Sequence, residues 1–247
     1  MLNEYRKQLD RIDDALVDAF SERLKTIDAI SAYKRENHLE AYDPDRERDM
    51  LSRLASRVPV SQRAAVESLY ASILSISKAQ QRFQNTNVVL IGMPGSGKTS
   101  IARRLSVLMN RPIASTDEVA ESRIGDTIES LFRTQGEAAF RAIETEVVRS
   151  LASVWGSIIA TGGGTILSEE NRQILRINSR IYYVKRPLED LDTTGRPLSQ
   201  GAGALERLYK ERHAVYESFC DVMLDADADF DQTARRIADE FGSYYHV

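Results

Sequence analysis

A glycine-rich stretch in the middle of the chain could hold the phosphates of a nucleotide. Residues 92–99 have the sequence GMPGSGKT, in which two glycines separated by four residues precede a lysine and a hydroxyl residue. Glycines let backbone amides curl around phosphate oxygens, and the N-terminus of a following helix adds a positive dipole end. We expect Lys98 to reach the β- and γ-phosphates and Thr99 to ligate Mg²⁺. The expected nucleotide-binding residues are Gly92, Gly95, Ser96, Gly97, Lys98, Thr99 and Ser100.

Two further polar features follow strand-like runs. Asp117 comes directly after the run PIAST, and three consecutive glycines, residues 162–164, follow the run SIIAT. In α/β folds, ligands bind outside the carboxyl ends of the strands. Both features are therefore expected at the same edge of a sheet as the phosphate-binding stretch.

Three arginines of the same half could bind anions. Arg141 lies three residues before Glu144, so both share one face of a helix. Arg196 lies in GRPL, a polar stretch with glycines that we expect to form a mobile flap, and Arg212 lies on a helix expected to face back across the site. For each arginine alone a surface salt bridge is the simpler interpretation, but their order and context favour a site.

A second set of charged side chains lies in the first third of the chain. Arg23 interrupts an apolar stripe, and Lys34 lies almost three full turns further on, hence on the same face. Later polar residues at helical spacings are Asp43, Arg46, Glu47, Ser77 and Gln81. Buried charges without partners are costly, so a small anionic ligand explains these cations better than the alternative, a polar network that fixes the register of a bundle.

The elements that position this second set are helices. Residues 1–82 contain no glycine, and apolar residues from Leu9 to Tyr33 recur at spacings of three and four. This pattern predicts one helix of roughly 30 residues, about 45 Å long. Two shorter helices cannot cover it within about 80 residues, so we expect a dimer with interleaved long helices.

Capping signals predict the two shorter helices. Asp43 and Pro44 fit the N-cap and first position of a second helix that stops near Pro59. Ser61 could cap a third helix that runs to about Arg82.

From Asn87 on, short apolar runs alternate with helical stretches. The runs are VVLIG, PIAST, SIIAT, IYYV and DVMLD. This alternation predicts a five-stranded parallel sheet with helices on both faces. The sequence therefore predicts an all-α three-helix domain over residues 1–84 and an α/β domain with a phosphate-binding loop over residues 85–247. Only FQNT joins the two, which is too short for a long flexible tether.

Residues 87–242 resemble shikimate kinase. The resemblance rests on the phosphate-binding loop, Asp117, the pair Phe140–Arg141, TGGG and RPL, and on Glu211, Arg212, Tyr216, Glu217 and Asp221. It implies ATP and shikimate as substrates and transfer of phosphate to the 3-hydroxyl of shikimate. The shikimate-binding residues that it implies are Asp117, Arg141, Gly162, Gly163, Gly164 and Arg212.

The resemblance also implies a role for each of these side chains. Arg141 and Arg212 would pair with the carboxylate, and Asp117 would orient or deprotonate the attacking hydroxyl. Arg196 would contact ATP and, with Lys98, stabilise charge on the transferring group. The glycines would present backbone amides to the ring substituents. Another small polyol acid, such as gluconate, is an alternative acceptor.

Two positions depart from the pattern of shikimate kinases. Ser115 stands where the family commonly has an aspartate near Mg²⁺, so we expect the metal to be held by Thr99, phosphate oxygens and water. The flap, residues 191–203, is short and lacks basic residues before RPL. Weaker closure over ATP is expected.

Residues 2–82 resemble the all-helical class of chorismate mutase. The resemblance rests on YRKQLDRIDDALVDAFSERL, Lys34, DPDRERDML, Ser77 and Gln81. It implies an intertwined dimer and the rearrangement of chorismate to prephenate, in which catalysis comes from holding the reactive conformer and stabilising the ether oxygen. The implied chorismate-binding residues are Arg6, Arg23, Lys34, Asp43, Arg46, Glu47, Ser77 and Gln81.

The resemblance divides the roles among these residues. Arg6, Arg23 and Arg46 would bind the two carboxylates, with Arg6 contributed by the partner protomer. Lys34 and Gln81 would donate to the ether oxygen, and Glu47 would accept from the ring hydroxyl.

Composition excludes several other classes of protein. The net charge is −4, so no global basic field attracts nucleic acid. Cys220 is the single cysteine, which fits a reducing compartment. No apolar run approaches the roughly 20 residues that a membrane span needs. A cytoplasmic enzyme of aromatic amino-acid biosynthesis with both activities is expected, and a kinase with a non-catalytic, dimerising or feedback-sensing helical domain is the alternative.

Overall fold

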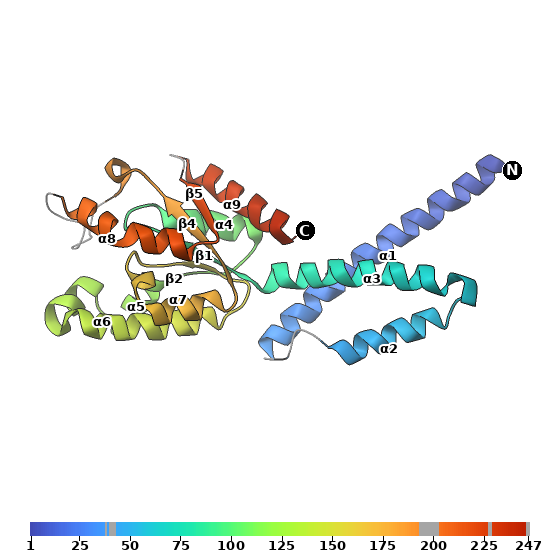
Figure 1. Cartoon of the computed structure of the whole chain (residues 1–247), viewed down its shortest axis with the longest axis horizontal. Helices are drawn as coiled ribbons and strands as arrows, with labels where there is room; N and C mark the ends of the chain where they lie inside the picture. The colour runs from blue at the N-terminus through green and yellow to red at the C-terminus, as the bar shows by residue number, and fades with distance from the viewer. Residues whose placement is uncertain (38, 40–42, 193–202, 227–228, 246–247) are drawn as a thin grey trace. The chain divides into compact units, whose positions relative to one another are not determined.

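The computed structural model describes residues 1–37, 39, 43–192, 203–226 and 229–245, which form two compact units (Figure 1). The first unit comprises residues 1–84 together with Tyr244 and Tyr245. The second comprises residues 85–243. The contacts thus divide the chain close to the point where glycines begin to appear in the sequence.

The described part of the first unit consists of three helices, as the sequence predicts. They are α1 Leu2–Glu36, α2 Pro44–Ala55 and α3 Val60–Asn85. The carboxylate of Asp43 accepts a hydrogen bond from the backbone N of Arg46 at 3.0 Å, which caps α2. Pro44 follows at the first helical position, where a missing N–H leaves no bond unmade.

The helix boundaries differ from the expected ones. Helix α2 ends at Ala55, before Pro59, and α3 already begins at Val60, so Ser61 lies in its first turn and does not cap it. Helix α3 continues to Asn85 because residues 83–85 include no glycine or proline that would end it. Thr86 alone separates α3 from the first strand.

Helix α1 reaches well beyond its polar contacts with α3. Residues 1–19 are exposed along their whole length. Gln80 Nε2 donates to Asp28 Oδ1 at 3.0 Å, and Arg23 donates to the hydroxyl of Ser77. The N-terminal half of α1 therefore presents its apolar residues to solvent in the single chain, and Figure 1 shows it extending past α2 and α3.

The second unit is built on a five-stranded parallel sheet, which confirms the expected fold. Its strands are β1 Asn87–Ile91, β2 Ile113–Ser115, β3 Ile158–Ala160, β4 Ser179–Lys185 and β5 Val222–Asp225, in the order β2-β3-β1-β4-β5. The helices are α4 Lys98–Met109, α5 Thr116–Ile124, α6 Ile128–Ala152, α7 Glu169–Arg176, α8 Ala204–Phe219 and α9 Phe230–Tyr245, with 3₁₀ turns η1 Thr165–Leu167 and η2 Leu188–Asp190.

Helices cover both faces of this sheet, because successive side chains of a strand point to opposite sides. Tyr183 of β4 stacks on Tyr216 of α8 with ring centroids 5.0 Å apart. The neighbouring Tyr182 points the other way and donates its hydroxyl to Glu240 of α9 at 2.6 Å. Both tyrosines are fully buried, as the near-continuous apolar run of β4 predicts.

The central strand β1 has β3 on one side and β4 on the other. The connection after β1 leads past β3 to β2, and the connection after β3 leads past β1 to β4. The loops that follow these two adjacent strands therefore diverge, which opens a crevice at the carboxyl ends of the strands. At the opposite end of the strands, the turn between α6 and β3 carries Trp155, the single tryptophan, which is 39% exposed. Among the described helices, none combines the length and apolar character that crossing a membrane requires.

Candidate active sites

The phosphate-binding loop lies between β1 and α4. Lys98 is the first residue of α4 and is only 7% exposed. Its Nζ donates to the carbonyl oxygens of Gly92 at 2.9 Å and Met93 at 2.8 Å. The lysine therefore folds back over the loop. Its ammonium group is bound to backbone carbonyls, which the phosphates of a nucleotide would have to replace.

Gly97, the N-cap of α4, must be a glycine for two reasons. Its φ of 88° lies in the left-handed region. A Cβ there would also lie 2.5 Å from Cζ of Phe230, the first residue of α9. The guanidinium carbons of Arg104 and Arg186 lie 5.7 and 5.2 Å from the centroid of the Phe230 ring, so this ring carries two cation–π contacts beside the loop.

A cavity of about 910 Å³ opens beside the phosphate-binding loop. Its wall contains most of the residues that the sequence predicts for nucleotide and acceptor. These are Gly95, Gly97, Lys98, Thr99, Ser100, Asp117, Arg141, Gly162, Gly163, Gly164 and Arg212. Gly92 and Ser96 are buried and lie outside this wall. Arg196 lies outside the residues that the structure describes.

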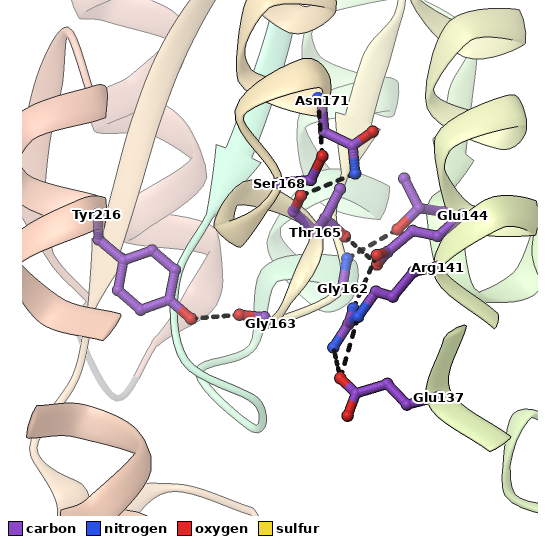
Figure 2. Close-up of polar contacts among 10 residues, drawn as sticks. Glu137, Arg141, Glu144, Gly162, Gly163, Thr165, Ser168, Asn171 and Tyr216 are labelled. Carbon is purple, nitrogen blue, oxygen red and sulfur yellow. Dashed lines mark hydrogen bonds and ion pairs between the residues drawn. The ribbon is translucent and has the colours of Figure 1, made fainter. Parts of the chain in front are cut away.

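Helix α6 brings Arg141 to the cavity and Glu144 to the loop after β3 (Figure 2). Glu144 is 2% exposed and accepts from Arg141 Nη1 at 2.7 Å and from the hydroxyl of Thr165 at 2.7 Å. Burial of Arg141 by itself would lower its pKa, but the charge of Glu144 and hydrogen bonds to Glu144 and Glu137 outweigh that cost, so the pKa of Arg141 is raised. Arg141 is a permanent cation in the cavity wall.

Helix α8 supplies the second cation of the cavity. Arg212 is 5% exposed, and its Nε is buried without a hydrogen-bond partner. A buried polar atom that lacks a partner costs about 1–3 kcal/mol, more for a charged group. Arg212 is thus poised for an anion that enters the cavity.

The glycine run after β3 is held from two sides. The backbone N of Gly162 donates to the hydroxyl of Thr116 at 2.7 Å. The hydroxyl of Tyr216 donates to the carbonyl oxygen of Gly163 at 2.5 Å (Figure 2), and burial raises the pKa of Tyr216 to about 12. Asp117 lies close by, since a Cβ on Gly162 would be 2.4 Å from its Oδ1. Carboxylate, glycines and both arginines therefore converge on one cavity.

Sequence reasoning missed several residues of this site. Glu144 was noted as the neighbour of Arg141 but not as the residue that ties the arginine to Thr165. Thr116 precedes the predicted Asp117 and offered no separate signal. The position of Phe230, an aromatic residue just after the last strand, could have suggested a place at the cavity edge.

In the first unit, the predicted residues lie on all three helices. Arg23, Lys34, Glu47 and Gln81 are partly buried, and Ser77 is 5% exposed. Arg6, Asp43 and Arg46 are exposed in the single chain. The carboxylate of Glu47 pairs with Lys78 Nζ at 2.9 Å. Lys78, next to the predicted Ser77, was also missed.

Two family models match the chain, one in each of its two units. The family model of shikimate kinase matches residues 94–242. The family model of chorismate mutase type II matches residues 5–82.

Individual relatives match the second unit. Shikimate kinases from Dictyoglomus turgidum and Rhodococcus jostii are 38% identical over 152 residues and 36% identical over 146 residues. These matches cover 58% and 56% of this chain and 88% and 87% of the relatives. Among solved structures, shikimate kinase from Acinetobacter baumannii in complex with shikimate is 29% identical, with a TM-score of 0.63 over 67% of this chain and 98% of that chain. The enzyme from Aquifex aeolicus is 27% identical, with a TM-score of 0.58 over 64% and 98%.

Proposed function

Because the chain belongs to the shikimate kinase family and carries a chorismate mutase type II domain before its kinase domain, we propose that it catalyses two reactions. The second unit transfers the γ-phosphate of ATP to the 3-hydroxyl of shikimate. The first unit rearranges chorismate to prephenate. The observation that carries the kinase proposal is the buried, unpartnered Nε of Arg212 in a cavity that also contains Arg141 and the phosphate-binding loop.

The acceptor would be held by its carboxylate and its ring hydroxyls. Arg141 and Arg212 would pair with the carboxylate, and the Gly162–Gly164 backbone would contact the ring substituents. The exposed carboxylate of Asp117 reaches the same cavity. It would take the proton of the 3-hydroxyl while the oxygen of that hydroxyl forms a bond to the γ-phosphorus. The bond between that phosphorus and the β-bridging oxygen then breaks, and ADP leaves.

Lys98 would stabilise the charge on the transferring phosphoryl group. For this its ammonium group must exchange the carbonyls of Gly92 and Met93 for phosphate oxygens, which are better acceptors because they are charged. Arg196 would add a second cation, although it lies outside the described residues.

The residues present fit Mg²⁺ bound mainly through the nucleotide. The Thr99 hydroxyl lines the cavity, and the described residues contain no group of three or more acidic, histidine or cysteine side chains that could hold a metal on its own. Mg²⁺ keeps several waters and accepts one or two protein ligands together with substrate phosphates. When bound, it would neutralise charge on the β- and γ-phosphate oxygens.

The mutase proposal rests on the cations of the first unit. Arg23 and Lys34 are partly buried on α1, and Gln81 lies on α3 near Ser77, to which Arg23 donates. Lys34 and Gln81 would donate to the breaking ether oxygen, and Glu47 would accept from the ring hydroxyl.

Completion of the mutase site would require a homodimer. Arg6 is exposed on the part of α1 that extends beyond α2 and α3, so we propose that it enters the site of a partner protomer, where Arg46 and Asp43 also become covered. We further propose a cytoplasmic location, which the single cysteine supports.

One experiment tests both activities in parallel. Purified protein is assayed for shikimate-dependent ADP release and for chorismate loss, with Lys98→Ala and Lys34→Ala as separate variants. Each substitution should reduce its own reaction by about 100-fold or more, as loss of a charge-stabilising donor does, and leave the other within about twofold. ADP release with gluconate in place of shikimate would instead identify the alternative acceptor.

The ion pair between Glu47 and Lys78 favours a second candidate for the first unit. A carboxylate held by lysine is a weaker acceptor for a substrate hydroxyl, which suits a domain that dimerises or senses chorismate without turning it over. Binding of chorismate without its loss would support this second candidate.

A further inference from the structure

The guanidinium of Arg141 donates to Glu137 and Glu144 (Figure 2) and lies against Gly164. A guanidinium has five N–H donors in a fixed plane, and a carboxylate binds it best along one edge. Which edge a substrate carboxylate can reach therefore depends on what already lies there.

The inner side of Arg141 is held permanently. Nη1 donates to Glu144, which is 2% exposed and also accepts from Thr165. If Glu144 lost its contact with Arg141, its buried carboxylate would keep only the neutral hydroxyl of Thr165 as a partner, which is costly. Glu144 therefore does not make way for a ligand.

The outer edge between the two terminal nitrogens is closed by backbone. A Cβ built on Gly164 would lie 2.8 Å from both Nη1 and Nη2 but 3.2 Å from Cζ. Because this Cβ position is nearer to the two nitrogens than to Cζ, it lies beyond the nitrogens, on the side from which a carboxylate would approach them. Gly164 thus leaves no room for a ligand oxygen on that edge.

The third edge, formed by Nε and Nη2, is held by Glu137. One carboxylate oxygen of Glu137 accepts from Nε at 3.2 Å and from Nη2 at 2.9 Å. The Glu137 side chain is 60% exposed, against 27% for Arg141. Such an exposed pair four residues apart on a helix is weak and exchanges with solvent.

We propose that Glu137 is a displaceable internal carboxylate, which occupies Arg141 in the free enzyme and gives way to the carboxylate of the substrate. This inference rests on the proposed kinase function and adds a residue that sets substrate affinity. Each binding event must break the pair between Glu137 and Arg141, so the pair raises the KM for an acceptor that carries a carboxylate.

The backbone beside Glu137 leaves room for this exchange. Gly136 has φ 82° and ψ 175°, which interrupts the regular path of α6 immediately before Glu137. A Cβ on Gly136 would meet nothing within 4 Å. The Glu137 side chain itself is 60% exposed, so its displaced carboxylate can turn into solvent.

The test compares Glu137→Gln and Glu137→Ala with Glu129→Gln. Glu129 also lies on α6 in the cavity wall, so its substitution removes the same charge without touching Arg141. Both Glu137 variants should lower the KM for shikimate by about two- to fivefold, the factor that corresponds to an exposed ion pair, at unchanged kcat and KM for ATP. An unchanged or raised KM for shikimate, or an equal drop in Glu129→Gln, would overturn the proposal.

An analogue of shikimate with the carboxylate reduced to an alcohol separates this effect from a general change in the cavity. Such an alcohol cannot take the place of Glu137 on Arg141, so its KM should be the same in the wild-type enzyme and in Glu137→Gln. A KM that falls equally for both compounds would also overturn the proposal. Failure of the proposed function itself has a different signature, because the wild-type protein would then release no ADP in response to shikimate.

Discussion

Ser115 has a structural role at the start of α5. It is 5% exposed, and its hydroxyl lies 3.5 Å from the backbone N of Glu118, where it caps α5. The hydroxyl satisfies one of the otherwise unpaired amides at the start of that helix. In the proposed kinase function, a neutral cap at this position would leave Mg²⁺ to Thr99 and the nucleotide.

Replacing Ser115 by aspartate should strengthen the binding of Mg²⁺. Aspartate caps helices as well as serine does, so the thermal midpoint of unfolding should change little. One added hydrogen bond to a metal-bound water, of about 1 kcal/mol, would lower the Mg²⁺ concentration for half-maximal kinase activity by about fivefold. Titration of Mg²⁺ at saturating ATP and shikimate measures this. The same half-maximal concentration in both proteins would show that Ser115 does not limit the metal site.

The N-terminal half of helix α1 exposes apolar side chains to solvent in the single chain. Leu9, Ile12 and Leu16 share one face and are 58%, 49% and 57% exposed. Covering such a stripe with the same stripe of a second chain would remove apolar area from water at roughly 25 cal/mol per Å². This is the physical basis for the proposed dimer.

A charge in this stripe should separate the dimer. Ile12→Asp would place a carboxylate in the proposed interface, which should raise the dissociation constant by about 100-fold or more. Chorismate loss should fall with it, because Arg6 would no longer reach the partner's site, while shikimate phosphorylation should persist. Ser21→Asp, on the opposite face of α1, is the matched control. Light scattering after gel filtration measures the mass, and an unchanged mass for Ile12→Asp would contradict the proposed interface.

The elements themselves were largely predictable from the sequence, and their ends were not. Periodicity gave α1, and the apolar runs gave all five strands, because a parallel sheet buries both faces of each strand. Helix α3 was expected to end near Arg82 but continues to Asn85, since no glycine or proline marks its end. The break at Gly136 inside α6 also had no separate signal, because a lone glycine is tolerated in a helix.

The sites were predictable where chemistry follows from a local pattern. Lys98 and Thr99 belong to one contiguous sequence motif at the start of α4, and the cavity wall contains both. The contact from Glu144 to Thr165 spans 21 residues and depends on how α6 packs against the loop after β3, so spacing alone could not reveal it. For the same reason the pairing of Glu47 with Lys78, between two helices, was missed.

At the scale of the whole molecule, the chain consists of two compact units that differ in how many side chains they bury. The first buries few side chains within one chain and leaves the start of α1 exposed, whereas the second buries a sheet between two layers of helices. Units of such unequal cores are not expected to share one unfolding transition.

The position of Trp155 makes this difference visible in optical measurements. Light that tyrosine does not absorb excites this one indole ring, so its emission reports on the second unit alone, while far-ultraviolet ellipticity is dominated by helices of both. In a urea titration the ellipticity should begin to fall before the emission changes, and the gap should narrow as the protein is concentrated. Ellipticity and emission curves that coincide at every protein concentration would show that both units unfold in one cooperative transition.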